Sequence, residues 1–319
     1  MMRLVLNIFS IFLSILCLFL IIFFNDFSNL IISFIENNFS NDKNIQPINK
    51  FGIKLYLILI VIFFLILSIL CFYKFRNFLH KSMKDIIDLP KLTNFLFFDE
   101  LTKKNYSYYF FAISIIICLS ITPYYLIIGA PAPEGFIESF LTFFFLVSAL
   151  IFLFSFFLVL KEKEKIYKKK SILLFLFLLS SFMFFIFLEE FSWGQKYFNR
   201  EVSEFFLKYN FQGETTVHNF FNPLFPLVYP LFGFMILISC IISWFFSPSL
   251  KTNFRIIFEP HPSLSLLILL MCSFSIKSNT EFFEEFFSIF CFFYSLRILL
   301  CIINPQKKVF SLQFHKNTL

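Results

Sequence analysis

The chain consists largely of long apolar stretches separated by short polar segments. Eight stretches have spanning or near-spanning length, and the seventh is the shortest: 4–24, 52–73, 107–129, 137–160, 171–188, 227–247, 263–276 and 282–303. About 20 apolar residues in a helix cross the hydrocarbon core of a bilayer. The pattern therefore predicts an all-α polytopic transmembrane bundle of about eight spans, forming a single integral membrane domain over residues 1–319.

The first stretch raises the question of a secretory signal peptide. Residues 4–24 are apolar, which is longer than the roughly 7–15-residue core of a typical signal, and no small-x-small cleavage site follows. We interpret this stretch as a retained first span.

Composition agrees with a membrane location. Hydrophobic residues make up 59% of the chain and charged residues 15%, whereas soluble domains have about 45–50% and about 25%. The seven cysteines all lie in apolar stretches and none forms a C-x-x-C pair. This placement favours small buried apolar side chains over a disulfide or zinc framework.

The basic residues predict the orientation of the spans. With eight spans and an internal N-terminus, 20 of the 27 Lys and Arg residues fall on internal segments, and the densest run is KEKEKIYKKK at 161–170. The positive-inside rule then places both termini in the cytoplasm. Because the net charge of +7 follows membrane sidedness, we exclude nucleic acid as a partner and expect membrane lipids instead.

The acidic residues collect at the opposite face, where 13 of the 20 Asp and Glu residues fall. The least apolar external segment is the loop 189–226, which we take as the candidate functional segment. Glu281, Glu284 and Glu285 begin the last span at the same face. Their positions also suit simple capping of a helix start, where the dipole favours carboxylates.

Four residues of this loop carry candidate chemistry: Glu189, Glu190, Glu214 and His218. The two adjacent carboxylates end the fifth span, where the helix dipole disfavours anions, so they need a cation as a neutralising partner, either a basic side chain or a metal ion. Glu214 and His218 are spaced i, i+4 and would share a face if that segment is helical. Glu190, Glu214 and His218 would then hold a divalent metal ion, or the carboxylates and the imidazole would act as a metal-free acid–base couple.

Further side chains in the loop suit substrate binding. Gln195, Gln212 and Asn219 offer amide donors and acceptors for hydroxyl-rich or phosphate-bearing ligands. Trp193 could stack on a sugar, although Trp is also common in the aromatic belt of membrane proteins.

Two short motifs in this loop resemble a known signature. They read E-E-x-S-W-G-Q at 189–195 and N-x-Q-x-E-x-x-x-H-N at 210–219. The pair resembles the signature of a group of uncharacterised bacterial polytopic membrane proteins, and the resemblance covers about 30 residues. It implies where the site lies, without implying a reaction, and a location in the bacterial cytoplasmic membrane.

Three functions remain as hypotheses. The first is a membrane enzyme, metal-dependent or not, acting on a lipid or lipid-linked glycan at the outer face. The second is a transporter or binding protein for a cation or cationic solute, which buried acidic residues within spans would favour. The third is a structural membrane subunit. The chain contains no H-E-x-x-H, G-x-S-x-G or phosphate-loop motif to choose among them.

Overall fold

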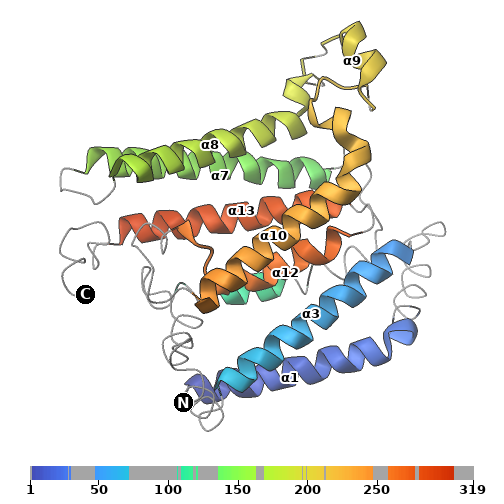
Figure 1. Ribbon diagram of the computed structural model, residues 1–319, viewed down its shortest axis with the longest axis vertical. Helices are drawn as coiled ribbons and strands as arrows, with labels where there is room; N and C mark the ends of the chain where they lie inside the picture. Colours follow the sequence, from blue (N-terminus) through green and yellow to red (C-terminus); the bar gives the residue numbers. More distant parts are fainter. Residues whose placement is uncertain are drawn as a thin grey trace.

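The computed structural model describes the protein as a bundle of helices (Figure 1). It describes residues 2–27, 29, 47–71, 106, 109–117, 120, 136–162, 169–195, 197–198, 200–211, 213–246, 258–276 and 280–304. Within these ranges the chain forms helices and connecting turns, and no strand occurs. The predicted all-α class is confirmed.

The elements follow one another along the chain in a simple order. The α-helices are α1 (Met2–Ile22), α3 (Pro47–Cys71), α7 (Phe136–Lys161), α8 (Lys169–Glu190), α9 (Glu204–Tyr209), α10 (Phe225–Phe246), α12 (Ser265–Phe274) and α13 (Thr280–Ile303). Three short 3-10 helices lie between them: η1 (Ser192–Gly194), η2 (His218–Leu224) and η3 (Pro262–Leu264).

Within the residues that the structure describes, four helices are long and apolar enough to cross a membrane: Thr142–Lys161, Lys169–Glu190, Phe225–Trp244 and Phe282–Ile303. Shorter apolar helices in the described part of the chain are Ile11–Ile22, Lys54–Ile66 and Pro262–Phe274. An integral membrane protein accounts for these helices, because their exposed side chains are apolar over lengths that match a bilayer.

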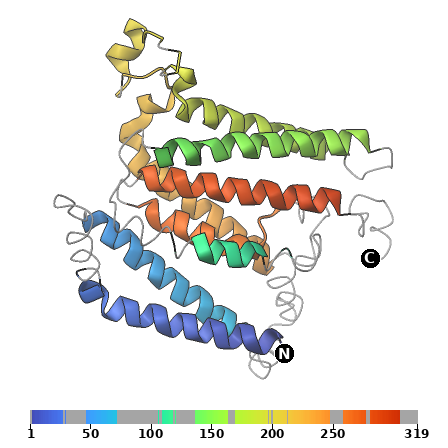
Figure 2. The ribbon, with the colours of Figure 1, turned by 180° about the vertical axis from the view of Figure 1, so that it is seen from behind.

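Helix α13 is the centre of the bundle. In its spanning part 67% of residues are buried, compared with 17–33% in the other three long helices. It packs against α7, α10 and α12, and Figures 1 and 2 show it between the α7–α8 pair on one side and α10 and α12 on the other. Aromatic rings form these contacts, for example Phe144 on Phe292 with ring centroids 4.9 Å apart.

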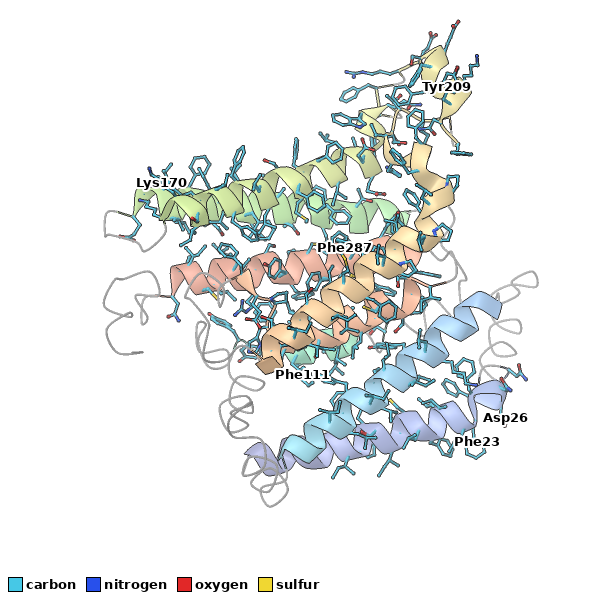
Figure 3. All side chains as sticks on the ribbon, viewed as in Figure 1. Phe23, Asp26, Phe111, Lys170, Tyr209 and Phe287 are labelled. Atoms are coloured by element: carbon cyan, nitrogen blue, oxygen red, sulfur yellow. The ribbon has the colours of Figure 1, made fainter. Side chains whose placement is uncertain are left out.

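The two ends of the bundle differ in chemistry. Lys170, the N-terminus and the end of α13 lie at one end, while Asp26, Tyr209 and the start of α13 lie at the other (Figures 1 and 3). We call the latter the loop end, because residues 191–217 project from it. The arrangement gathers the loop and the first turns of α10 and α13 at the same level.

The seventh predicted span is a broken element and not a continuous spanning helix. Helix α12 has 10 residues, which extend about 15 Å at 1.5 Å per residue, half of the roughly 30 Å hydrocarbon core. All ten residues are buried. The chain before it, residues 258–264, is irregular apart from η3 and is also buried, except for the half-buried Pro260.

Side chains from neighbouring spans satisfy the irregular backbone of this segment. Three consecutive carbonyls each accept a hydrogen bond: the Tyr294 hydroxyl donates to Phe258 O, Arg297 Nη1 donates to Glu259 O at 2.9 Å, and Trp244 Nε1 donates to Pro260 O at 2.7 Å. Buried non-helical backbone is tolerated only where protein or water satisfies its polar groups. These three donors therefore satisfy the irregular backbone that precedes α12.

This arrangement predicts a specific loss on Tyr294→Phe. Removal of the hydroxyl leaves the buried Phe258 carbonyl without its donor, so we expect the free energy of unfolding to fall by about 1–3 kcal/mol. Tyr109→Phe is the matched control, because Tyr109 is exposed, and should change stability by less than about 0.5 kcal/mol. Thermal unfolding of both purified variants tests this, and equal stability of the two would contradict it.

Candidate functional site

The chain leaves α8 through a tight left-handed turn. Ser192, Trp193 and Gly194 have φ angles of 46°, 52° and 73°. A left-handed conformation costs of order 1–3 kcal/mol for a residue other than glycine. At Gly194 a Cβ atom would lie 2.9 Å from two ring carbons of Phe198, so only glycine fits there. The turn directs the chain back over the end of α8.

The strained turn is maintained by hydrogen bonds to Glu189, which is 4% exposed. Its Oε1 accepts from Trp193 Nε1 at 2.7 Å. Its Oε2 accepts from the backbone N–H groups of Val217 at 2.7 Å and His218 at 2.9 Å. One carboxylate thus joins the end of α8 to a segment 28 residues further along the chain.

These donors explain how a buried carboxylate is tolerated at the end of α8. The C-terminus of a helix carries partial negative charge and disfavours an anion. The N-terminus of η2, which runs on into α10, has the opposite polarity and presents unpaired N–H groups. Glu189 caps that N-terminus, so N–H groups supply the neutralising partner that the sequence led us to expect from a cation.

His218 is the first residue of η2 and faces the same carboxylate. Its Nδ1 lies 3.2 Å from Glu189 Oε2, and its side chain is 28% exposed. The imidazole ring also stacks on Phe225 at a centroid distance of 6.1 Å. Since Glu189 Oε2 is a hydrogen-bond acceptor, the contact favours a proton on Nδ1 and leaves Nε2 as the acceptor nitrogen.

Hydrogen bonds made by polar side chains build the rest of the loop. The Ser192 hydroxyl donates to Glu214 Oε2 at 2.8 Å. Gln195 Oε1 accepts from the Thr215 N–H at 2.8 Å. Asn219, which is 1% exposed, donates through Nδ2 to Thr216 Oγ1 at 2.7 Å. These contacts fix residues 213–219 against the turn at 192–195.

The structure therefore brings most of the predicted site residues together, in roles that differ from the sequence hypothesis. Trp193 donates to Glu189 while its ring is 41% exposed. Gln195 and Asn219 use their amides to support the loop. Glu190 is half-buried in the last turn of α8, and Gln212 lies outside the described residues.

Asn210 is a supporting residue that the site prediction did not include. Its Nδ2 donates to the Thr216 carbonyl at 2.7 Å, and the residue is 6% exposed. The sequence signal for this role was the position of Asn210 at the start of the motif at 210–219. A buried amide in a polar loop must find hydrogen-bond partners.

The shared helical face expected for Glu214 and His218 does not form. Residues 213–217 are non-helical, and helical structure begins at His218. Gly213 has a φ of 66°, and the Glu189 cap starts η2 four residues after Glu214. The conditional expectation of an i, i+4 pair was wrong for this reason.

The residues described contain no group of three His, Cys, Asp or Glu side chains arranged to hold a metal ion. The ligand set Glu190, Glu214 and His218 is therefore not supported. Glu214 accepts from Ser192, and His218 contacts Glu189. What the geometry retains is the carboxylate–imidazole couple.

A stack of aromatic rings links this couple to the centre of the bundle. From His218 the stack continues through Phe225 to Tyr229 and then to Phe283 of α13, with centroid distances of 4.8 Å for each of the last two steps. The Tyr229 hydroxyl donates to Glu284. The ring of His218 is thus held from one side by Glu189 and from the other by a stack that ends on α13.

Comparison of the chain with protein-family models, with curated proteins and with solved structures found no match. The functional interpretation therefore depends on the geometry of the site.

Glu189→Gln tests the structural role of the carboxylate. An amide has one acceptor oxygen and no charge, so we expect a loss of about 1.5–3 kcal/mol in the stability of the loop, the range for bonds to a charged group. Tryptic cleavage after Arg200 and Lys208 should then accelerate about tenfold or more, since 1.4 kcal/mol corresponds to a factor of ten.

The matched control for that experiment is Glu201→Gln. Glu201 is exposed in the same loop, so its charge should contribute less than about 0.5 kcal/mol. Equal cleavage rates for Glu189→Gln and Glu201→Gln would show that Glu189 does not hold the loop.

Proposed function

We propose that the protein is an integral membrane enzyme that uses Glu189 and His218 as an acid–base couple on a lipid or a lipid-linked glycan at the outer face. The observation that carries the proposal is the 3.2 Å contact between Glu189 Oε2 and Nδ1 of an imidazole that is partly exposed. A histidine oriented by a carboxylate is a recurrent arrangement for general base catalysis.

The couple works through the two nitrogens of His218. Nδ1–H donates to Glu189, which fixes the tautomer and the orientation of the ring. Nε2 then removes a proton from a water molecule or a hydroxyl group of the substrate. The imidazolium that forms is stabilised by the adjacent carboxylate, and the proton is returned to the leaving group. This role needs no metal ion.

The surroundings of the Glu189–His218 couple favour a lipid substrate. The site lies where α8 ends and α10 begins, and the orientation proposed below puts it at the level where a lipid headgroup meets its acyl chains. Apolar side chains of the same loop have at least 41% exposure: Trp193, Tyr197, Phe198, Phe205, Leu207, Tyr209, Phe211, Val217 and Phe221. Aromatic residues are enriched at this level of a bilayer, and an apolar surface of this kind suits a substrate that stays in the membrane.

The proposal includes a membrane orientation. We infer that the chain crosses the bacterial cytoplasmic membrane about eight times, with both termini in the cytoplasm and the loop end outside. The basic residues support this, because Lys170, the last residue of the basic run at 161–170, lies at the end opposite the loop (Figure 3). The signature at 189–195 and 210–219 supports membership of a bacterial membrane protein group.

Mass spectrometry of lipids tests the activity. The purified protein is reconstituted into vesicles made from bacterial polar lipids with added lipid-linked glycan, and the lipids are compared before and after incubation. We expect a new or depleted species with wild-type protein. His218→Gln should reduce that conversion by about 10²–10⁴-fold, the usual contribution of a general base.

The control variant for the conversion assay is Glu204→Gln. Glu204 is exposed in α9 of the same loop, so this variant should keep wild-type conversion. Unchanged conversion by His218→Gln, or no conversion by the folded wild-type protein, would contradict the enzyme proposal.

Cysteine labelling tests the orientation. In a variant without native cysteines, a membrane-impermeant maleimide added to intact cells should modify a cysteine at Tyr209 and spare one at Lys170. Both positions are exposed in the structure, so accessibility on each side depends only on the membrane. The reverse labelling pattern would refute an external loop.

A further inference from the structure

The first turns of α13 contain two neighbouring carboxylates in contrasting environments. Glu284 is half-buried and accepts a hydrogen bond from the Tyr229 hydroxyl. Glu285 is 5% exposed, and neither of its carboxylate oxygens has a hydrogen-bond partner among the residues described. Glu285 is the fourth residue of the apolar helix Phe282–Ile303.

The described neighbours of Glu285 on α13 are apolar and donate no hydrogen bond to its carboxylate. One turn away on α13 lie Phe282 at 0% and Ile289 at 3% exposure. The Ser288 hydroxyl is also buried, but it donates to the Glu285 backbone carbonyl at 2.7 Å and not to the carboxylate. An ionised carboxylate without donors in apolar surroundings is so unfavourable that such groups generally become neutral.

Among the described residues, no basic side chain on the helices packed against the start of α13 compensates for the charge. The helices α10 and α12 contribute two titratable groups near the start of α13. The Tyr229 hydroxyl of α10 is bonded to Glu284, and the Cys272 thiol of α12 donates to the Gly233 carbonyl. The described side chains of α7 between residues 142 and 160 include no titratable group, and residues 109–117 include only Tyr109, which is exposed.

Helix α13 itself has one basic residue, Arg297. It is twelve residues from Glu285, about 18 Å along the helix at 1.5 Å per residue. Its Nη1 is directed to the Glu259 carbonyl of the broken span. The attraction between Arg297 and the Glu285 carboxylate across that distance does not replace local hydrogen bonds to the carboxylate.

We propose that Glu285 is a proton-binding site within the membrane, loaded from the loop end of the bundle. A proton fits this position better than a metal ion, because a single carboxyl group suffices for it, whereas hard cations require several oxygen ligands. Ionisable residues inside spans commonly take part in proton transfer. The site is separate from the Glu189–His218 couple and gives the protein a second activity, proton uptake.

Chemical labelling of the wild-type protein tests the proposal directly. Dicyclohexylcarbodiimide is apolar and reacts with protonated carboxyl groups in apolar surroundings, and peptide mass spectrometry locates the product. We expect modification at Glu285 that declines as the pH is raised. Glu284→Gln should keep the modification and Glu285→Gln should lose it. Modification at Glu284 with none at Glu285 would overturn the proposal.

Thermal unfolding provides an independent measurement. If Glu285 is protonated in the folded protein and ionised in the unfolded chain, the folded state binds more protons, and stability falls as the pH rises. Glu285→Gln removes this dependence, so its unfolding temperature should exceed that of the wild-type protein by an amount that grows with pH. A variant less stable than wild type at alkaline pH would overturn the proposal.

Discussion

The loop end of this protein depends on one buried carboxylate between two helices of opposite polarity. Glu189 ends α8, where an anion is disfavoured, and caps η2, where an anion is favoured. Its remaining oxygen accepts from Trp193, a residue in a left-handed conformation. The same group thus offsets an unfavourable helix end, supports a strained turn and fixes the start of α10. Few other side chains could replace it, because a neutral amide lacks both the charge and the second acceptor oxygen.

The position of His218 follows from that capping interaction. The backbone N–H that donates to Glu189 belongs to the residue whose imidazole contacts it, so formation of the cap also orients the ring. Phe225, Tyr229 and Phe283 then continue the packing to α13, the most buried of the long helices. A flexible surface loop would position a histidine poorly, whereas here the ring is held by a cap on one side and by the bundle on the other. This rigidity is what a general base requires.

The sequence predicted the helical class, and it singled out the segment whose side chains the structure brings together, because both depend on local patterns. Long apolar runs indicate spans, and polar residues concentrated at 189–219 indicate a functional segment. It could not predict that Glu189 would cap a helix 28 residues away, since such contacts depend on the path of the turn at Ser192–Gly194. It also could not predict the broken span at 258–274, where the composition is apolar but Tyr294, Arg297 and Trp244 satisfy the backbone. Glu285 resembled a helix cap in the sequence, and only its burial distinguishes it from one.

The central claim is that Glu189 holds His218 in the tautomer with hydrogen on Nδ1. Nitrogen NMR of protein labelled with ¹⁵N-histidine tests this most directly, because the chain has only four histidines and His218→Gln identifies the relevant signals. We expect that Nδ1 carries the hydrogen-bonded proton in the neutral ring of His218 while Nε2 is unprotonated, and that the Nδ1 signal changes in Glu189→Gln. A proton on Nε2 in the neutral ring, or signals unaffected by Glu189→Gln, would contradict it.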